Sequence, residues 1–124
     1  MSKYRNQRTT VNGIIFDSRR EAKRYCELAV LEKAGEIQNL QIQKTFVLVP
    51  EQRAGPTERY KKGIHKGEWK QGTLLERPIT YIADFAYYEN GRLVVEDAKG
   101  LRTKEYILKR KLMLYIHGIR IKEV

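Results

Sequence analysis

An Asn-Gly pair at residues 90–91 separates two runs that favour β-strands, and it constrains the fold more than any other feature. The runs are PITYIADFAYY (78–88) and RLVVEDAK (92–99). Asparagine and glycine both tolerate the positive φ angles of a two-residue type I′ turn, which matches the twist of an antiparallel hairpin. The sequence therefore predicts a β-hairpin in which Glu89 pairs with Arg92.

This register sets charged side chains opposite one another. Counting back from the turn, Asp84 is expected opposite Asp97, and Ile82 opposite Lys99. Because strand side chains alternate between faces, Asp84, Asp97 and Lys99 share one face and Glu96 takes the other. A three-residue loop with a bulge would instead put Asp84 opposite Glu96. The lysine favours the first register, since only Asp97 shares its face.

Two opposed carboxylates repel each other, and both can stay ionised if a cation lies between them. Oxygen ligands at this spacing suit Mg²⁺, which also binds substrate phosphates. Lys99 could stabilise developing negative charge or help to activate water, so the arrangement suits phosphodiester hydrolysis. An isolated Asp-Ala-Lys triplet is more often an exposed ion pair. Asp84, however, lies within the apolar run TYIADF, where burying an acid costs free energy that a purely structural role would not offset.

The remaining elements give the order α-β-β-β-α-β. A first helix is expected over residues 17–35, with Ser18 as its N-cap, Glu21 at the capping-box position and Gly35 as its end. Alternating apolar residues predict a strand over residues 39–50. A short strand or hairpin edge is expected at VNGIIF, before the first helix.

A second helix is expected from the cap Thr103 to the stop Gly118, and IRIKEV (119–124) forms the last strand. A strand–helix–strand connection implies a right-handed crossover to a parallel neighbour. The predicted fold is one α/β domain over residues 1–124, a mixed central sheet flanked by helices.

Three further side chains have roles that depend on where they lie on the two helices. Glu21 either only caps the first helix or also binds a metal ion. Cys26, the single cysteine, is expected in the core, and one cysteine excludes an intramolecular disulfide and a thiolate cluster. His117 is expected to have a structural role beside the helix end.

The charge balance points to a polyanion. The chain has 25 Lys and Arg against 15 Asp and Glu, a net charge of +10. Nucleic acid is the expected partner, and a merely solubilising surface is the alternative. Residues 1–10 form a basic arm, and residues 51–78, which show no periodicity, form a mobile basic loop with Trp69 and His65 as possible contacts.

No stretch of the chain is long and apolar enough to predict a membrane span, and the polar, basic N-terminus lacks the apolar core of a signal peptide. We therefore expect a cytoplasmic protein without a membrane partner.

The runs FDSRREAKRY, YIADF, VVEDAKG and IKEV resemble the PD-(D/E)XK nuclease superfamily. Its restriction-endonuclease-like αβββαβ core carries an acid on the second core strand, matched by Asp84, and a (D/E)xK triplet on the third, matched by 97–99. Glu21 matches a first-helix glutamate of Holliday-junction resolvases and transposon nuclease subunits. More closely, the chain resembles a phage-associated family of uncharacterised function. The proline from which the superfamily takes its name is not adjacent to the acid in this chain, since Pro78 lies six residues before Asp84.

The resemblance implies a metal ion, Mg²⁺ with Mn²⁺ as a substitute, held by Asp84, Asp97, the carbonyl of Ala98 and Glu21. Lys99 would serve the attacking water. Glu21, Asp84, Asp97 and Lys99 are thus the expected catalytic residues. The DNA backbone is expected to contact six cationic residues: Arg19, Arg20, Lys61, Lys62, Arg102 and Lys104.

The expected activity is Mg²⁺-dependent endonucleolytic cleavage of branched or junction DNA in phage replication or recombination, in the cytoplasm of a bacterial host. One site per chain suits a symmetric dimer if both strands are cut. The alternatives are a non-catalytic nucleic-acid-binding or host-interaction protein that keeps the fold, and a nuclease subunit that is silent until a partner joins.

Overall fold

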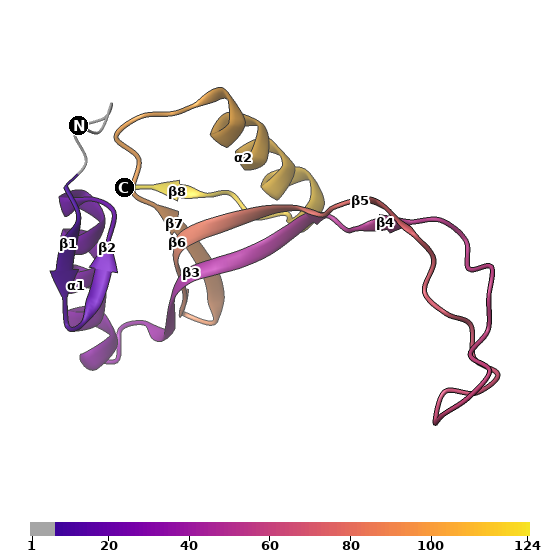
Figure 1. Cartoon of the computed structure of the whole chain (residues 1–124). Coiled ribbons are helices and arrows are strands. Elements are labelled where there is room, and N and C mark those ends of the chain that lie inside the picture. Colours follow the sequence, from indigo (N-terminus) through magenta and orange to yellow (C-terminus); the bar gives the residue numbers. More distant parts are fainter. Residues whose placement is uncertain (1–6) are drawn as a thin grey trace. The chain divides into compact units, whose positions relative to one another are not determined.

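The computed structural model describes residues 7–124, which divide into two compact units. Unit 1 comprises the described residues up to Phe46 together with Tyr81–Val124, and unit 2 is Val47–Thr80. Figure 1 shows the elements along the chain. Their bounds are β1 Thr9–Val11, β2 Ile14–Phe16, α1 Arg19–Lys33, β3 Gln38–Val49, β4 Gln52–Arg53, β5 Leu74–Glu76, β6 Ile79–Glu89, β7 Arg92–Asp97, α2 Lys104–His117 and β8 Lys122–Glu123.

The central sheet has four strands in the order β3-β6-β7-β8. Strands β6 and β7 are antiparallel, whereas β7 and β8 are parallel, with Glu96 beside Lys122 and Asp97 beside Glu123. Two helices flank this mixed sheet. The order α1-β3-β6-β7-α2-β8 confirms the predicted αβββαβ arrangement, including the parallel last strand.

The β6–β7 hairpin has the predicted turn and register. Asn90 and Gly91 both have positive φ angles, 53° and 77°. The paired residues run from Glu89–Arg92 to Phe85–Glu96.

The hairpin differs from the prediction at its far end. The ladder of paired residues ends at Phe85–Glu96, so Asp84 and Asp97 lie just beyond it, and the expected pairing of Ile82 with Lys99 is wrong because β7 ends at Asp97. The physical reason is local: the backbone N–H of Ala98 donates to Oδ2 of Asp84 at 2.8 Å, so a side chain takes the donor that a longer ladder would use.

Helix α1 begins and ends where the sequence predicts. The Oγ of its N-cap, Ser18, accepts the N–H of Glu21, and Gly35 after its end has a φ of 81°. Its apolar stripe packs in a core cluster that comprises Phe16, Ala22, Leu28, Ile37, Phe85 and Tyr87.

The prediction that Cys26 lies in this core is wrong, because its side chain is exposed. On a helix of 3.6 residues per turn, position 26 falls beyond the edge of the stripe formed by Ala22 and Leu28.

Helix α2 also has the predicted ends. Thr103 caps it by accepting the N–H of Tyr106, and Gly118 stops it in the left-handed conformation at a φ of 67°. Tyr106 and Met113 are its buried residues, and the Tyr106 ring lies 6.4 Å from that of Tyr81 on β6. His117 is the last helical residue, and its ring lies 5.9 Å from that of Phe46.

Unit 2 contains more structure than the predicted loop. Strands β4 and β5 pair antiparallel, and Arg59 and Trp69 form a further antiparallel bridge. Its residues are mostly exposed on both faces, so no apolar alternation marks the strands in the sequence.

At the N-terminus, β1 and β2 form the short hairpin expected at VNGIIF. Residues 1–6 of the predicted basic arm lie outside the described residues. Within residues 7–124, neither helix is long and apolar enough to cross a membrane.

An ion pair fastens α1 to the sheet. Glu96 on β7 is fully buried, and its two carboxylate oxygens accept hydrogen bonds from Nε and Nη2 of Arg24, each at 2.7 Å. The hydroxyl of Tyr87 on β6 also donates to it. Burial alone would raise the pKa of Glu96, but the bonds from Arg24 and Tyr87 lower it below the usual value, so the carboxylate is ionised.

We expect Arg24→Met to lower the free energy of unfolding by about 3–5 kcal/mol, because Glu96 would stay buried without its countercharge. Urea denaturation measures this change. The neighbouring exposed substitution Lys23→Met should cost less than about 0.5 kcal/mol, and the double variant Arg24→Met/Glu96→Gln should recover much of the loss. Equal stability of Arg24→Met and Lys23→Met would contradict the anchoring role.

Candidate functional site

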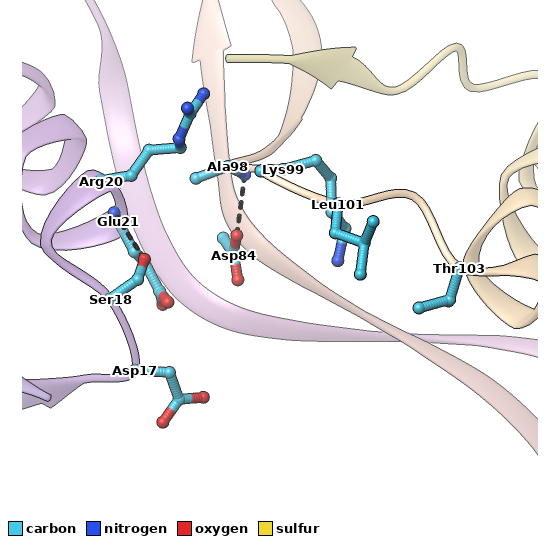
Figure 2. Close-up of a pocket in the computed structure, with 10 residues that line it drawn as sticks. Asp17, Ser18, Arg20, Glu21, Asp84, Ala98, Lys99, Leu101 and Thr103 are labelled. Carbon is cyan, nitrogen blue, oxygen red and sulfur yellow. Dashed lines mark hydrogen bonds between the residues drawn. The ribbon is translucent and has the colours of Figure 1, made fainter. Parts of the chain in front are cut away.

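A pocket of about 460 Å³ opens in unit 1 beside the first turn of α1. The start of α1, strand β6 and the segment between β7 and α2 supply its walls, as Figure 2 shows. Three of the four predicted catalytic residues are among its ten lining residues, which are Asp17, Ser18, Arg20, Glu21, Asp84, Ala98, Lys99, Gly100, Leu101 and Thr103.

Asp84 projects from β6 into this pocket and accepts the N–H of Ala98 (Figure 2). Burial, the charge of Asp97 and a hydrogen bond with Asp97 raise the pKa of Asp84 to about 8, and the Ala98 N–H opposes this only partly. Two carboxylates this close cannot both ionise easily without a cation. In the protein without a bound cation, Asp84 therefore retains a proton near neutral pH.

Asp97 is almost completely buried, at 1% exposure. Its Oδ2 accepts the hydroxyl of Tyr81. Burial and this bond raise the pKa of Tyr81 well above its usual value, so the phenol can only donate. Oδ1 of Asp97 is buried, and within residues 7–124 it has no hydrogen-bond donor. The contact that this oxygen makes is therefore a charge contact, with the ammonium group of Lys99, and not a hydrogen bond.

Lys99 lies on the same side as Asp97, as predicted. Its Nζ is 3.2 Å from Oδ1 of Asp97, a charge contact without hydrogen-bond geometry, and 4.5 Å from the centre of the Tyr106 ring. Because the carboxylate and the ring both attract the ammonium group, Lys99 is held at the edge of the pocket.

Glu21 lies at its predicted capping position and also faces the pocket. Its N–H donates to Oγ of Ser18 at 3.1 Å, which caps the start of α1. The same carboxylate points into the pocket (Figure 2) and accepts Nε2 of Gln43 at 2.9 Å. Burial and the charges of Asp17 and Asp97 raise the pKa of Glu21, so capping does not isolate it from the other acids.

Gln43 and Tyr81 were missed by the sequence analysis. Gln43 has a φ of 52° within β3, a conformation that costs a non-glycine residue roughly 1 kcal/mol or more and often occurs beside functional sites. Nothing in the surrounding residues Gln41, Ile42 and Lys44 indicates this backbone conformation or a role for Gln43 in the pocket. Tyr81 lies in an apolar run, where a tyrosine is expected simply as a core residue.

The six predicted DNA-contacting cations are divided between the two units. Arg20 lines the pocket, and Arg19 and Lys104 are exposed at the starts of α1 and α2. Arg102 is bound to Glu123, with Nη2 and Oε1 2.8 Å apart, so its charge is largely compensated. Lys61 and Lys62 belong to unit 2.

The acidic side chains in and beside the pocket are the candidate metal ligands. Among residues 7–124, no three or more His, Cys, Asp or Glu side chains are already arranged to hold a metal ion. The donor chemistry nevertheless fits a hard cation: Oδ1 of Asp97 is buried and accepts no hydrogen bond from the described residues, and burial and the charge of Asp97 disfavour the ionised form of the adjacent Asp84. The acids that a metal ion would need therefore line or adjoin this pocket, with Lys99 in contact with one of them.

We expect Asp84→Asn to stabilise the protein increasingly as pH rises, when divalent metals are chelated. The unfolded chain loses the Asp84 proton near its ordinary pKa, whereas the folded chain keeps it until about pH 8. Folding of the wild type is therefore penalised as pH rises through this window, and asparagine, which does not ionise, escapes the penalty.

Urea denaturation in a chelator should show the stability difference between variant and wild type growing by roughly 3–4 kcal/mol from about pH 5 to pH 8, then levelling off. Glu89→Gln, at the exposed end of the same strand, should show no such slope. A pH-independent difference for Asp84→Asn would refute the proposed proton.

A comparison with protein families places these residues in a wider group. The family model described as "Protein of unknown function (DUF1064)" matches residues 1–122. No curated protein and no solved structure matches the chain. Because the match spans nearly the whole chain, the protein belongs to the DUF1064 family.

Proposed function

We propose that this protein is a metal-dependent DNA endonuclease that hydrolyses phosphodiester bonds. The observation that carries the proposal is the gathering of Asp84, Asp97 and Lys99 beside Glu21, with an Asp97 oxygen that has no hydrogen bond. Neighbouring acids beside a lysine at an open pocket suit metal-assisted hydrolysis.

Asp84 and Asp97 would hold Mg²⁺, or Mn²⁺ in its place, with the carbonyl of Ala98 and with Glu21 directly or through water. When bound, the ion supplies positive charge to polarise the phosphate. Gln43 orients the Glu21 carboxylate, and Tyr81 fixes Oδ2 of Asp97, so that Oδ1 faces Lys99 without a hydrogen bond.

Lys99 would act on the attacking water and on the charge that develops at phosphorus. Its side chain is 28% exposed at the edge of the pocket, so a phosphate can approach it. Its contacts with Asp97 and Tyr106 limit its motion, and a pre-positioned cation is what stabilises such a transition state.

The net charge of +10 favours a polyanionic substrate. Arg20 at the pocket, the exposed Arg19 and Lys104, and Lys61 and Lys62 in unit 2 would contact phosphates without reading sequence. We infer branched or junction DNA in phage recombination as the substrate, the bacterial cytoplasm as the place of action and a symmetric dimer as the active form.

A second candidate function is DNA binding without catalysis. The observation that favours it is that Lys99 contacts Asp97 while no three ligating side chains within residues 7–124 are arranged for a metal ion. A related candidate is a nuclease subunit whose site is completed only when a partner joins.

We expect Asp84→Asn to reduce Mg²⁺-dependent cleavage of a junction or duplex DNA by at least about 100-fold, because it removes a negatively charged ligand. DNA binding, measured by fluorescence anisotropy in a chelator, should persist within about threefold, since phosphate contacts come from other residues. Glu89→Gln, on the same strand but outside the pocket, should cut like the wild type.

The nuclease proposal fails if the wild type cuts no branched or linear DNA in Mg²⁺ or Mn²⁺, or if Asp84→Asn cuts equally well. Wild-type binding of Mn²⁺ by calorimetry that Asp84→Asn abolishes, without cleavage by either protein, would instead support the subunit that awaits a partner.

A further inference from the structure

The turn of unit 2 presents one apolar side chain with unusual exposure. Ile64 is 94% exposed, which is more than any other large hydrophobic residue described. It lies between Gly63 and Gly67, whose φ angles of 86° and 88° allow the tight turn. Backbone bonds from Lys66 to Gly63 and from Gly67 to Tyr60 hold this turn closed.

The two strands below the turn are fixed to each other. Arg59 and Trp69 form an antiparallel bridge, and the Arg59 guanidinium lies 4.4 Å from the centre of the Trp69 ring. On the next position, the backbone N–H of Tyr60 donates to Glu68 at 2.9 Å. The turn is therefore carried on a narrow, ordered two-stranded ribbon.

The charge around Ile64 is positive. Lys61, Lys62 and Lys66 have no carboxylate within ion-pair distance in the part of the chain that the structure describes. Glu68, the nearest acid in sequence, contacts Nδ1 of His65 at 2.9 Å. Further down the ribbon the cations are compensated: Arg53 is paired with Glu51 and Lys70 with Glu58.

We propose that this turn enters the minor groove of duplex DNA and that Ile64 wedges between two base pairs, which bends the duplex. The inference rests on the proposed function, since it takes DNA as the partner. Apolar wedges flanked by cations are how minor-groove proteins unstack and kink DNA. The three lysines would neutralise phosphates on either side of the groove while Ile64 enters it.

A protein partner accounts less well for the same surface. Protein interfaces have a contiguous apolar or aromatic centre with charged residues at the rim. Here the most exposed apolar side chain stands among three lysines. Trp69 and Tyr60 are 54% and 39% exposed, and each ring has a cation beside it, with Arg59 4.4 Å and Lys70 5.7 Å from the ring centre.

The test uses the full chain and a short duplex in a chelator, so that no cleavage occurs. End-to-end energy transfer reports the bend, and 2-aminopurine within the duplex reports unstacking. We expect wild-type protein to bend the duplex by roughly 20–90° and to raise the 2-aminopurine fluorescence. Ile64→Ala should lose most of both signals while its affinity falls by less than about tenfold, because phosphate contacts supply most of the binding.

Leu75→Ala is the matched control, since Leu75 is also exposed in unit 2 but lies on β5 away from the turn. It should bend DNA like the wild type. The triple variant Lys61→Ala/Lys62→Ala/Lys66→Ala should lower the slope of log affinity against log salt by about 2–3.

A straight duplex with bound wild type, or a bend that Ile64→Ala retains, overturns the wedge. Tighter binding of the turn to an acidic polypeptide than to DNA, abolished by Ile64→Ala, would assign it to a protein partner instead. Cleavage without bending would overturn the wedge and leave the nuclease proposal intact. Bending without cleavage would support the wedge and count against the nuclease proposal.

Discussion

The buried pair of Arg24 and Glu96 is the interaction on which the site depends. Glu96 and Asp97 are consecutive residues of β7, and both are buried. Arg24 takes up the charge of Glu96 and thereby fastens α1 to the strand. Glu21 precedes Arg24 by three residues, so it lies on the same side of the helix one turn earlier. Fixing Arg24 on the sheet therefore also fixes where Glu21 meets the pocket.

The two buried acids of β7 are stabilised in different ways, and the difference indicates their roles. Glu96 has a bidentate arginine and a tyrosine, and its ionised form is fully satisfied. Asp97 has one tyrosine hydrogen bond, a nearby ammonium group and a close acidic neighbour. The hydrogen-bonding capacity of Glu96 is filled, whereas that of Asp97 is only partly filled. We therefore assign a structural role to Glu96 and a chemical role to Asp97.

Local signals in the sequence were sufficient for the hairpin register and for both helix boundaries. The Asn90-Gly91 turn set the register that brings Asp84 near Asp97, and Ser18, Thr103 and Gly118 marked helix ends through backbone bonds between near neighbours. The features that could not be predicted depend on contacts distant in sequence. Gln43, which has a positive φ, donates to Glu21 from 22 residues away, and the backbone N–H that follows the end of β7 donates to the side chain of Asp84.

The hydrogen bond from the N–H of Ala98 to Asp84 links the length of strand β7 to the chemistry of the pocket. A variant that extended β7 through Ala98 would withdraw its N–H from Asp84 and leave that carboxyl with one fewer donor. Conversely, a change at Asp84 frees the backbone at the point where the chain leaves the sheet. An acid of the pocket thus determines where strand β7 ends. Selection on the strand end or on the acid would therefore act on both.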